Sequence, residues 1–225
     1  MSGFPDELDV PVVDGGELAD APVRRTLRSS EVVFTGHVWD VVRERVELSG
    51  GNPVTRDVQR HPGAVTILAL DEDENVLFVR QYRHPVRREL WELPAGLLDV
   101  AGEAPLPAAR RELAEEADLV ASRWDVVVDW FNSPGGSSEA NRIYLARGLS
   151  AVPEVDRHVR EDEEKDMVAV RVPLVQAVRA VLDGRVGNPG SVIGVLALQA
   201  VKADGFTTLR PADTPWPRGL IHPEG

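Results

Sequence analysis

An alternation of apolar and polar positions is the first regular pattern along the chain. Val42, Val46 and Leu48 share one face by a period of two, and charged residues face the opposite way. The turn-forming run at 49–52 follows, and the β-branched stretch after it is typical of a returning strand. We therefore predict an N-terminal antiparallel β unit over residues 26–62.

Apolar runs and helical patterns alternate between residues 63 and 204. Strands are predicted at 63–71, 76–84, 124–130, 141–148 and 167–173. Helices are predicted at 104–119, 174–184 and 190–203. This mixture favours an α/β sandwich, with helices packed on a mixed sheet.

Neither end of the chain shows a regular spacing of hydrophobic residues. Residues 1–25 are acidic and punctuated by proline and glycine, so we expect a flexible arm there. Residues 205–225 contain four prolines, so we expect an extended tail. The first residues lack the basic and apolar regions of a signal peptide, and no apolar run approaches the ~18 residues that a membrane helix needs. We expect a cytoplasmic protein with no membrane partner.

Charge and composition narrow the function classes. The net charge of −12 disfavours a nucleic-acid partner, because phosphate backbones are bound by lysine and arginine. The chain has no cysteine, which excludes disulfides and thiolate-bound zinc. Any metal site must therefore use oxygen or imidazole ligands.

The helix predicted over residues 104–119 concentrates carboxylates. Its docking face is apolar and consists of Leu106, Ala109, Leu113 and Ala117. Glu112 and Glu116 lie one turn apart, where like charges cost roughly 0.2–0.5 kcal/mol in an exposed helix. A shared divalent cation would remove that repulsion, and carboxylate oxygens suit Mg²⁺ or Mn²⁺. A solvated, glutamate-rich helix face is the alternative interpretation.

The segment around this helix resembles the signature of the Nudix hydrolases. It reads WELPAGLLDVAGEAPLPAARRELAEEADL, and it matches the pattern at Gly96, Glu103, Arg111, Glu112, Leu113, Glu115, Glu116 and Leu119. Six residues rather than five separate Gly96 from Glu103, which lengthens a loop. Asp118 stands where the family has glycine, and aspartate enters the left-handed region more readily than most residues. The resemblance extends over roughly residues 63–203.

This resemblance implies a Nudix α/β/α sandwich with a mixed sheet and a divalent-cation hydrolase of nucleoside diphosphates linked to another group. By position, Glu112, Glu116 and the main-chain carbonyl of Ala95 would hold Mg²⁺ or Mn²⁺. Glu115 would add a ligand or stay bound to Arg111. The cations would offset the repulsion between a pyrophosphate and a carboxylate-lined pocket, and they would orient the attacking water.

Three further stretches resemble the ADP-ribose pyrophosphatase branch of that family. They are QYRH, LWELPAG and the SPGG that begins at Ser133, with Pro134 sixteen residues after Asp118. The branch implies hydrolysis of ADP-ribose to AMP and ribose 5-phosphate. It also implies a homodimer in which two subunits exchange their N-terminal units and share active sites.

The same resemblance implies substrate contacts, and each has a plain alternative. Arg83 would contact the diphosphate or a ribose, or it pairs with surface acids. Glu92 would hold adenine or a ribose hydroxyl, or it is a structural acceptor. Trp39 or Arg56 of the exchanged unit would cover adenine, although Trp39 fits a core or interface aromatic equally well. Glu139 would reach the terminal ribose, and the run 134–136 is alternatively a hairpin loop.

A water that attacks phosphorus needs a base or a positioning carboxylate. In this branch the base is a glutamate of a loop after the Nudix helix, and here the loop at 158–167 is crowded with acids. Glu164 is the first candidate and Glu163 the second, while a solvated charged loop is the alternative. His84 and His158 are expected to be structural or exposed.

Two other functions stay open. One keeps the fold but changes the substrate to another nucleoside diphosphate sugar or a nucleoside triphosphate. The other is a non-catalytic nucleotide sensor, which usually lacks the motif glutamates; here Glu112, Glu115 and Glu116 are all present.

Overall fold

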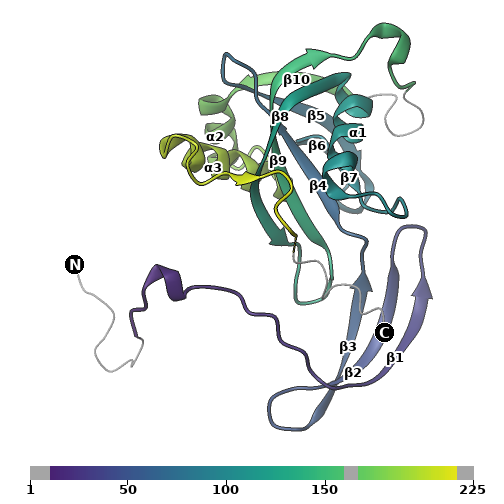
Figure 1. Cartoon of the computed structure of the whole chain (residues 1–225). Coiled ribbons are helices and arrows are strands. Elements are labelled where there is room, and N and C mark those ends of the chain that lie inside the picture. The colour runs from purple at the N-terminus through teal and green to yellow at the C-terminus, as the bar shows by residue number, and fades with distance from the viewer. Residues whose placement is uncertain (1–10, 160–166, 217–225) are drawn as a thin grey trace.

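The computed structural model describes residues 11–159 and 167–216, and it divides them into a small N-terminal sheet and a larger α/β body (Figure 1). The N-terminal sheet is antiparallel, with β1 (Leu27–Thr35), β2 (Asp40–Glu47) and β3 (Pro53–Arg60) in sequence order. A tight turn through Gly36 separates β1 from β2, where the sequence pattern showed no break. A β-carbon on Gly36 would lie 2.5 Å from the carbonyl oxygen of Trp39, so this turn depends on glycine.

The larger body is built on a five-stranded mixed sheet in the order β11-β8-β9-β4-β7. The strands are β4 (Ala64–Ala69), β7 (Ala95–Leu97), β8 (Leu119–Phe131), β9 (Ala140–Ala151) and β11 (Arg210–Pro211). The β4 and β9 strands run parallel, and the other pairs are antiparallel. This arrangement confirms the predicted mixed sheet.

A second, antiparallel sheet has the order β10-β5-β6. Its strands are β5 (Asn75–Arg83), β6 (Arg88–Glu92) and β10 (Val168–Pro173). The residues between β6 and β7 are only Leu93 and Pro94, so the chain passes from the second sheet directly into the first. Glu92 and Ala95 are thereby held close together.

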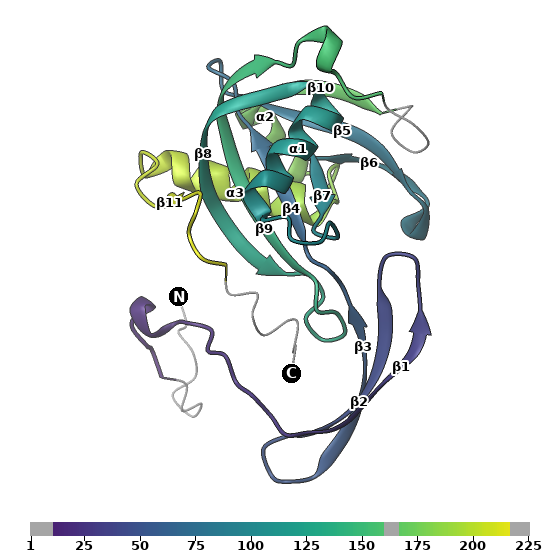
Figure 2. The same ribbon diagram turned by 45° about the vertical axis from the view of Figure 1, so that its right-hand side comes forward.

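Helices cover both faces of the sheets, as Figures 1 and 2 show. On one side α1 (Pro105–Ala117) buries Ala108, Ala109 and Leu113 against β4, β8 and β9. On the other side α2 (Leu174–Leu182) and α3 (Pro189–Ala203) enclose a second apolar core. Short 3-10 helices lie at Gly15–Glu17, His84–Val86 and Glu154–Asp156. The predicted α/β/α layering is therefore correct.

The ends of α1 follow from its sequence. Pro105 occupies the first helical turn, where its missing N–H has no intrahelical partner to lose. Asp118 ends the helix in the left-handed region at φ 53°, and its N–H donates to the carbonyl of Ala114. Asp118 therefore adopts the left-handed backbone conformation at the position where the family has glycine. The helix ends there as expected, and β8 begins at Leu119.

The terminal segments differ from each other. Residues 11–26 are exposed and, outside the 3-10 helix, irregular. Residues 205–216 instead return to the body, where β11 pairs with β8 at the edge of the five-stranded sheet. Within residues 11–159 and 167–216, no helix has the length and apolar character needed to cross a membrane.

Candidate functional site

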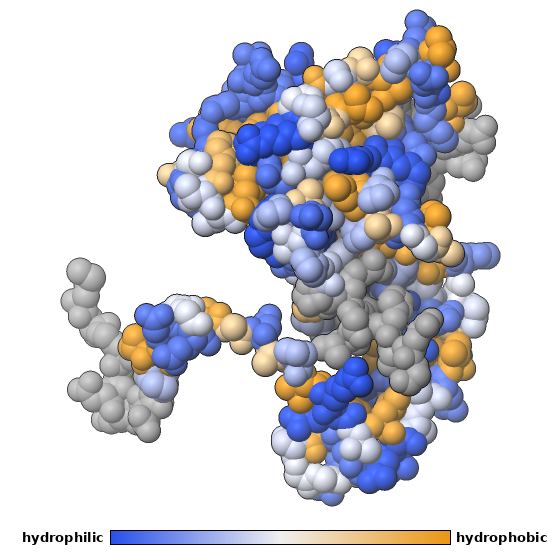
Figure 3. Space-filling model, viewed as in Figure 1, coloured by the Kyte–Doolittle hydropathy of each residue, from blue (hydrophilic) through white to orange (hydrophobic). Residues whose placement is uncertain are grey.

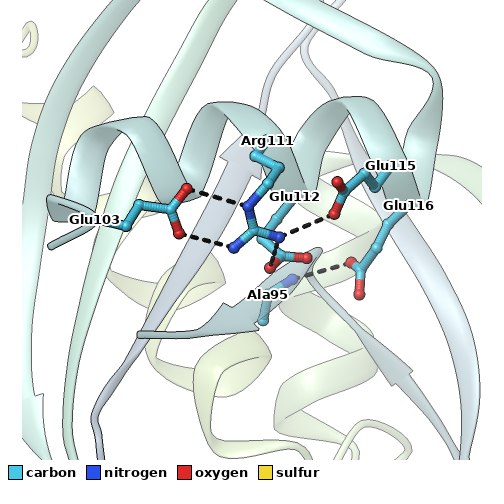
Figure 4. Close-up of polar contacts among 6 residues, drawn as sticks. All are labelled: Ala95, Glu103, Arg111, Glu112, Glu115 and Glu116. Carbon is cyan, nitrogen blue, oxygen red and sulfur yellow. Dashed lines mark hydrogen bonds and ion pairs between the residues drawn. The ribbon is translucent and has the colours of Figure 1, made fainter. Parts of the chain in front are cut away.

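Two buried carboxylates of α1 face the backbone of β7 (Figure 4). Glu112 is 9% exposed and Glu116 is 8% exposed, so neither lies on a solvated helix face. Glu116 Oε2 accepts a hydrogen bond of 3.0 Å from the main-chain N–H of Ala95. A β-carbon on Gly96 would lie 2.0 Å from the carboxylate of Glu112. Glycine at position 96 therefore makes room for the acid that the helix places there.

Arg111 ties three of the surrounding acids together. Its Nε and Nη2 donate to both carboxylate oxygens of Glu103, at 3.1 and 2.9 Å. Its Nη1 donates to Glu112 at 2.6 Å and to Glu115 at 2.9 Å. These contacts lower the pKa of Glu103 and raise that of Arg111. The predicted contact with Glu115 is present, and Glu103 is the additional partner that fixes the long loop before α1.

The donor set fits a hard divalent cation that keeps much of its water. Glu112 and Glu116 supply buried carboxylates, and the β7 backbone lies beside them. Among residues 11–159 and 167–216, no three acidic or imidazole side chains form a closed ligand cage. Mg²⁺ is usually held by one or two carboxylates with waters and substrate phosphates completing its shell, so two inner glutamates are sufficient.

A cavity of about 550 Å³ opens beside the β7 backbone. It brings together five residues that the sequence analysis singled out: Trp39, Arg83, Glu92, Ala95 and Glu139. Gly96 also lines it, which joins the cavity to the carboxylate pair of α1. Its volume suits a nucleotide-sized ligand.

Arg83 and Glu92 form a two-point ion pair across β5 and β6. Arg83 Nε donates to Oε1 at 3.0 Å and Nη2 donates to Oε2 at 2.8 Å. The Glu92 side chain is 4% exposed, whereas that of Arg83 is 41% exposed. Glu92 therefore orients Arg83, whose partly exposed side chain lines the cavity.

Glu139 is held by two side-chain amides that the sequence analysis missed. Asn132 Nδ2 donates to Oε2 at 2.8 Å, and Asn141 Nδ2 donates to Oε1 at 3.1 Å. All three residues line the cavity. Their only sequence signal was polar character at the two ends of the hairpin loop that joins β8 and β9.

Arg56 and Pro134 are not among the residues that line the cavity. Arg56 lies on β3, where its Nη1 donates to the carbonyl of Thr55 at 2.8 Å. Pro134 lies in the β8–β9 loop, which bonds to the end of β3 through Gln59 and Gly136. Glu163 and Glu164, the candidate bases, lie outside the described residues.

Comparisons with known proteins agree with this geometry. Residues 60–189 match the NUDIX domain family. An ADP-ribose pyrophosphatase of Mycobacterium tuberculosis is 48% identical over 84% of this chain and 89% of its own length. An ADP-ribose pyrophosphatase of Bacillus subtilis is 34% identical over 78% of this chain and 92% of its own length.

A crystal structure described as an ADP compounds hydrolase has the same fold, with a TM-score of 0.65. It is 21% identical, and the match covers 83% of this chain and 99% of that one. The buried carboxylates of α1 and the glycine that makes room for them are consistent with these similarities. The chain belongs to the NUDIX domain family.

Proposed function

We propose that this protein hydrolyses ADP-ribose to AMP and ribose 5-phosphate with the help of a divalent cation. The observation that carries the proposal is the buried pair Glu112 and Glu116, held against the β7 backbone at the edge of the cavity. A buried like-charged pair is costly by itself and becomes favourable with a cation. The named activity of the relatives supports ADP-ribose as the substrate.

Glu112, Glu116 and the main-chain oxygen of Ala95 would hold Mg²⁺ or Mn²⁺. Glu115 would either add a ligand or stay bound to Arg111, whose Nη1 donates to both Glu112 and Glu115. When bound, the cation supplies charge stabilisation for the phosphoryl oxygens and acidifies or orients water. Arg111 holds the Glu112 and Glu115 side chains in place, so that they need not rearrange when the ion binds.

The substrate would lie along the cavity. Arg83, oriented by Glu92, would contact the diphosphate or a ribose, and Glu139 would accept hydrogen bonds from the terminal ribose. Trp39 or Arg56, from the exchanged β unit, would cover adenine. Glu164, or Glu163 in its place, would act as the base on the attacking water.

A homodimer is part of the proposal. The N-terminal sheet carries exposed apolar side chains, and Figure 3 shows apolar patches on it. They include Leu27, Val32, Phe34 and Leu48. A thin sheet with an exposed apolar surface is stabilised when a second copy covers it.

We further propose a cytoplasmic location and a division into an arm (1–25), an exchanged β unit (26–62), a catalytic core (63–204) and a tail (205–225).

A metal-dependent substrate panel tests this function. The purified protein is incubated with ADP-ribose, other nucleoside diphosphate sugars and nucleoside triphosphates, each with Mg²⁺, with Mn²⁺ or with a chelator. We expect ADP-ribose to be cleaved fastest and the chelator to stop cleavage. Hydrolysis of a triphosphate without hydrolysis of ADP-ribose would replace the proposed substrate, and no hydrolysis of any of them would favour a sensor.

A further inference from the structure

A buried histidine in the cavity wall has no part in the function described so far. His61 follows β3, is 8% exposed and lines the cavity together with Glu139. Its main-chain N–H donates to Ser138 Oγ at 2.9 Å. Its ring Nδ1 accepts a hydrogen bond of 3.1 Å from the main-chain N–H of Gly63. The backbone and one ring nitrogen are therefore fixed by the protein.

The bond to Nδ1 sets the tautomer of the ring. Burial lowers the pKa of His61 below its usual value, which favours the neutral ring near neutral pH, although the charge of Glu139 opposes this shift. Because Nδ1 accepts a hydrogen bond, the neutral ring carries its proton on Nε2. Among the described residues, no hydrogen bond uses this Nε2. A donor in the cavity wall is thus left for a ligand.

Glu139 supplies the complementary acceptor. The amides of Asn132 and Asn141 each occupy one position on its carboxylate, and each oxygen retains a further lone pair. The carboxylate lies close enough to His61 for its charge to act on the ring. A phosphate group would be repelled by this carboxylate. A sugar hydroxyl can accept from one group and donate to the other, so the pair suits a polyhydroxyl ligand.

The two groups are also held in a fixed relation. The N–H of Gln59 donates to the carbonyl of Gly136 at 2.9 Å, and the N–H of Ser138 donates to the carbonyl of Gln59 at 3.0 Å. These bonds attach the loop that carries Glu139 to the strand end that carries His61. A donor and an acceptor fixed before binding discriminate more sharply between ligands than mobile groups do.

We propose that His61 determines specificity for the sugar end of the substrate by donating a hydrogen bond from Nε2 to a sugar hydroxyl beside Glu139. This inference rests on the proposed function for the location of the sugar in the cavity. It assigns His61 to binding and gives it no part in the transfer of the phosphoryl group.

A matched pair of variants tests the proposal. His61→Gln carries an amide N–H to about the position of Nε2, and His61→Asn keeps an acceptor for the N–H of Gly63 but loses the donor in the cavity. The binding of ADP-ribose and of AMP is measured by calorimetry with a chelator present, so that no turnover is needed. We expect His61→Asn to weaken ADP-ribose binding about tenfold and His61→Gln less than about threefold, with AMP binding unchanged in both.

Three results would overturn the proposal: equal weakening in the two variants, no weakening in either, or an equal loss of AMP binding. A measurement on the wild-type protein removes any dependence on how the variants fold. With ¹⁵N-labelled histidine, saturating ADP-ribose should shift the Nε2 resonance of His61, and AMP should leave it in place. An unmoved resonance would contradict the proposal. Binding without hydrolysis after metal addition would instead count against the proposed function alone.

Discussion

The carboxylate of Glu112 occupies the space that a β-carbon at position 96 would need, so only glycine fits at Gly96. A β-carbon at position 96 would lie 2.0 Å from both Cδ and Oε1 of Glu112, far inside van der Waals contact. The helix carboxylate is therefore seated against the β7 backbone itself. This close approach places a buried acid beside Ala95 and Glu116, where the proposed cation would bind.

Gly96→Ala should displace Glu112 and remove most metal-dependent activity. The added methyl group meets a carboxylate held by Arg111, and movement of that side chain breaks the 2.6 Å ion pair between them. We expect at least about a hundredfold loss of kcat/KM with Mg²⁺, because metal ligands tolerate little displacement. Gly187→Ala is the matched control, since a β-carbon there meets nothing within 4 Å. Normal activity of Gly96→Ala would argue against Glu112 as a ligand.

Arg111→Ala should lower stability most when no cation is present. The change leaves Glu103, Glu112 and Glu115 without the guanidinium that they share, at a cost of about 2–3 kcal/mol. Added Mg²⁺ would then replace part of the lost positive charge and raise Tm more than it does in the wild-type protein. Thermal unfolding with and without Mg²⁺ measures both effects. Arg110→Ala, an exposed neighbour on the same helix, serves as the control, and an equal Tm gain in all three proteins would refute the prediction.

The motif helix and its surroundings show what the sequence could predict. The apolar spacing, the early prolines and Asp118 all act within one helix, so local pattern was enough to predict α1 and its left-handed end. The ion pair of Arg83 with Glu92 and the amide contacts of Glu139 depend on strands meeting across the sheets. The hydrophobic periodicity within one segment does not predict which side chains of different strands will contact each other.

Other features could not be predicted because the sequence segments that form them are short. His61 is a single histidine in a strand-end sequence, and only the folded cavity wall shows its relation to Glu139. The two-residue β11 is too short to carry a strand period, and it forms because β8 offers an open edge. Val-rich sequence on both sides of Gly36 concealed the turn between β1 and β2.

Arg142→Ala should destabilise the fold without contacting the proposed site. Arg142 is 1% exposed, pairs with Asp129 at 2.7 Å and donates to the carbonyl of Thr214 at 2.7 Å, which anchors the tail. Removal of one partner of a buried pair costs about 3–5 kcal/mol. Urea unfolding measures the change. Arg123→Ala, whose side chain is 63% exposed, should cost less than about 1 kcal/mol, and equal costs would contradict this account.

Glu164→Gln should lower kcat by about 100- to 10,000-fold with a modest change in KM, as expected for the loss of a general base. Glu163→Gln provides the direct comparison, because it makes the same change of charge one residue away in the chain. Steady-state kinetics with ADP-ribose separate the two. A larger effect at Glu163 would move the base to that residue, and unaffected rates in both variants would exclude this pair.

We propose that Glu116, buried against the Ala95 backbone, holds a cation that makes ADP-ribose hydrolysis possible. The most direct measurement identifies the products formed from ADP-ribose by the wild-type protein and by Glu116→Gln, each with Mg²⁺, after circular dichroism has shown that both are folded. AMP and ribose 5-phosphate are expected from the wild-type protein, and essentially no product is expected from the variant. Equal product formation by the two proteins would show that Glu116 does not hold the cation that hydrolysis needs.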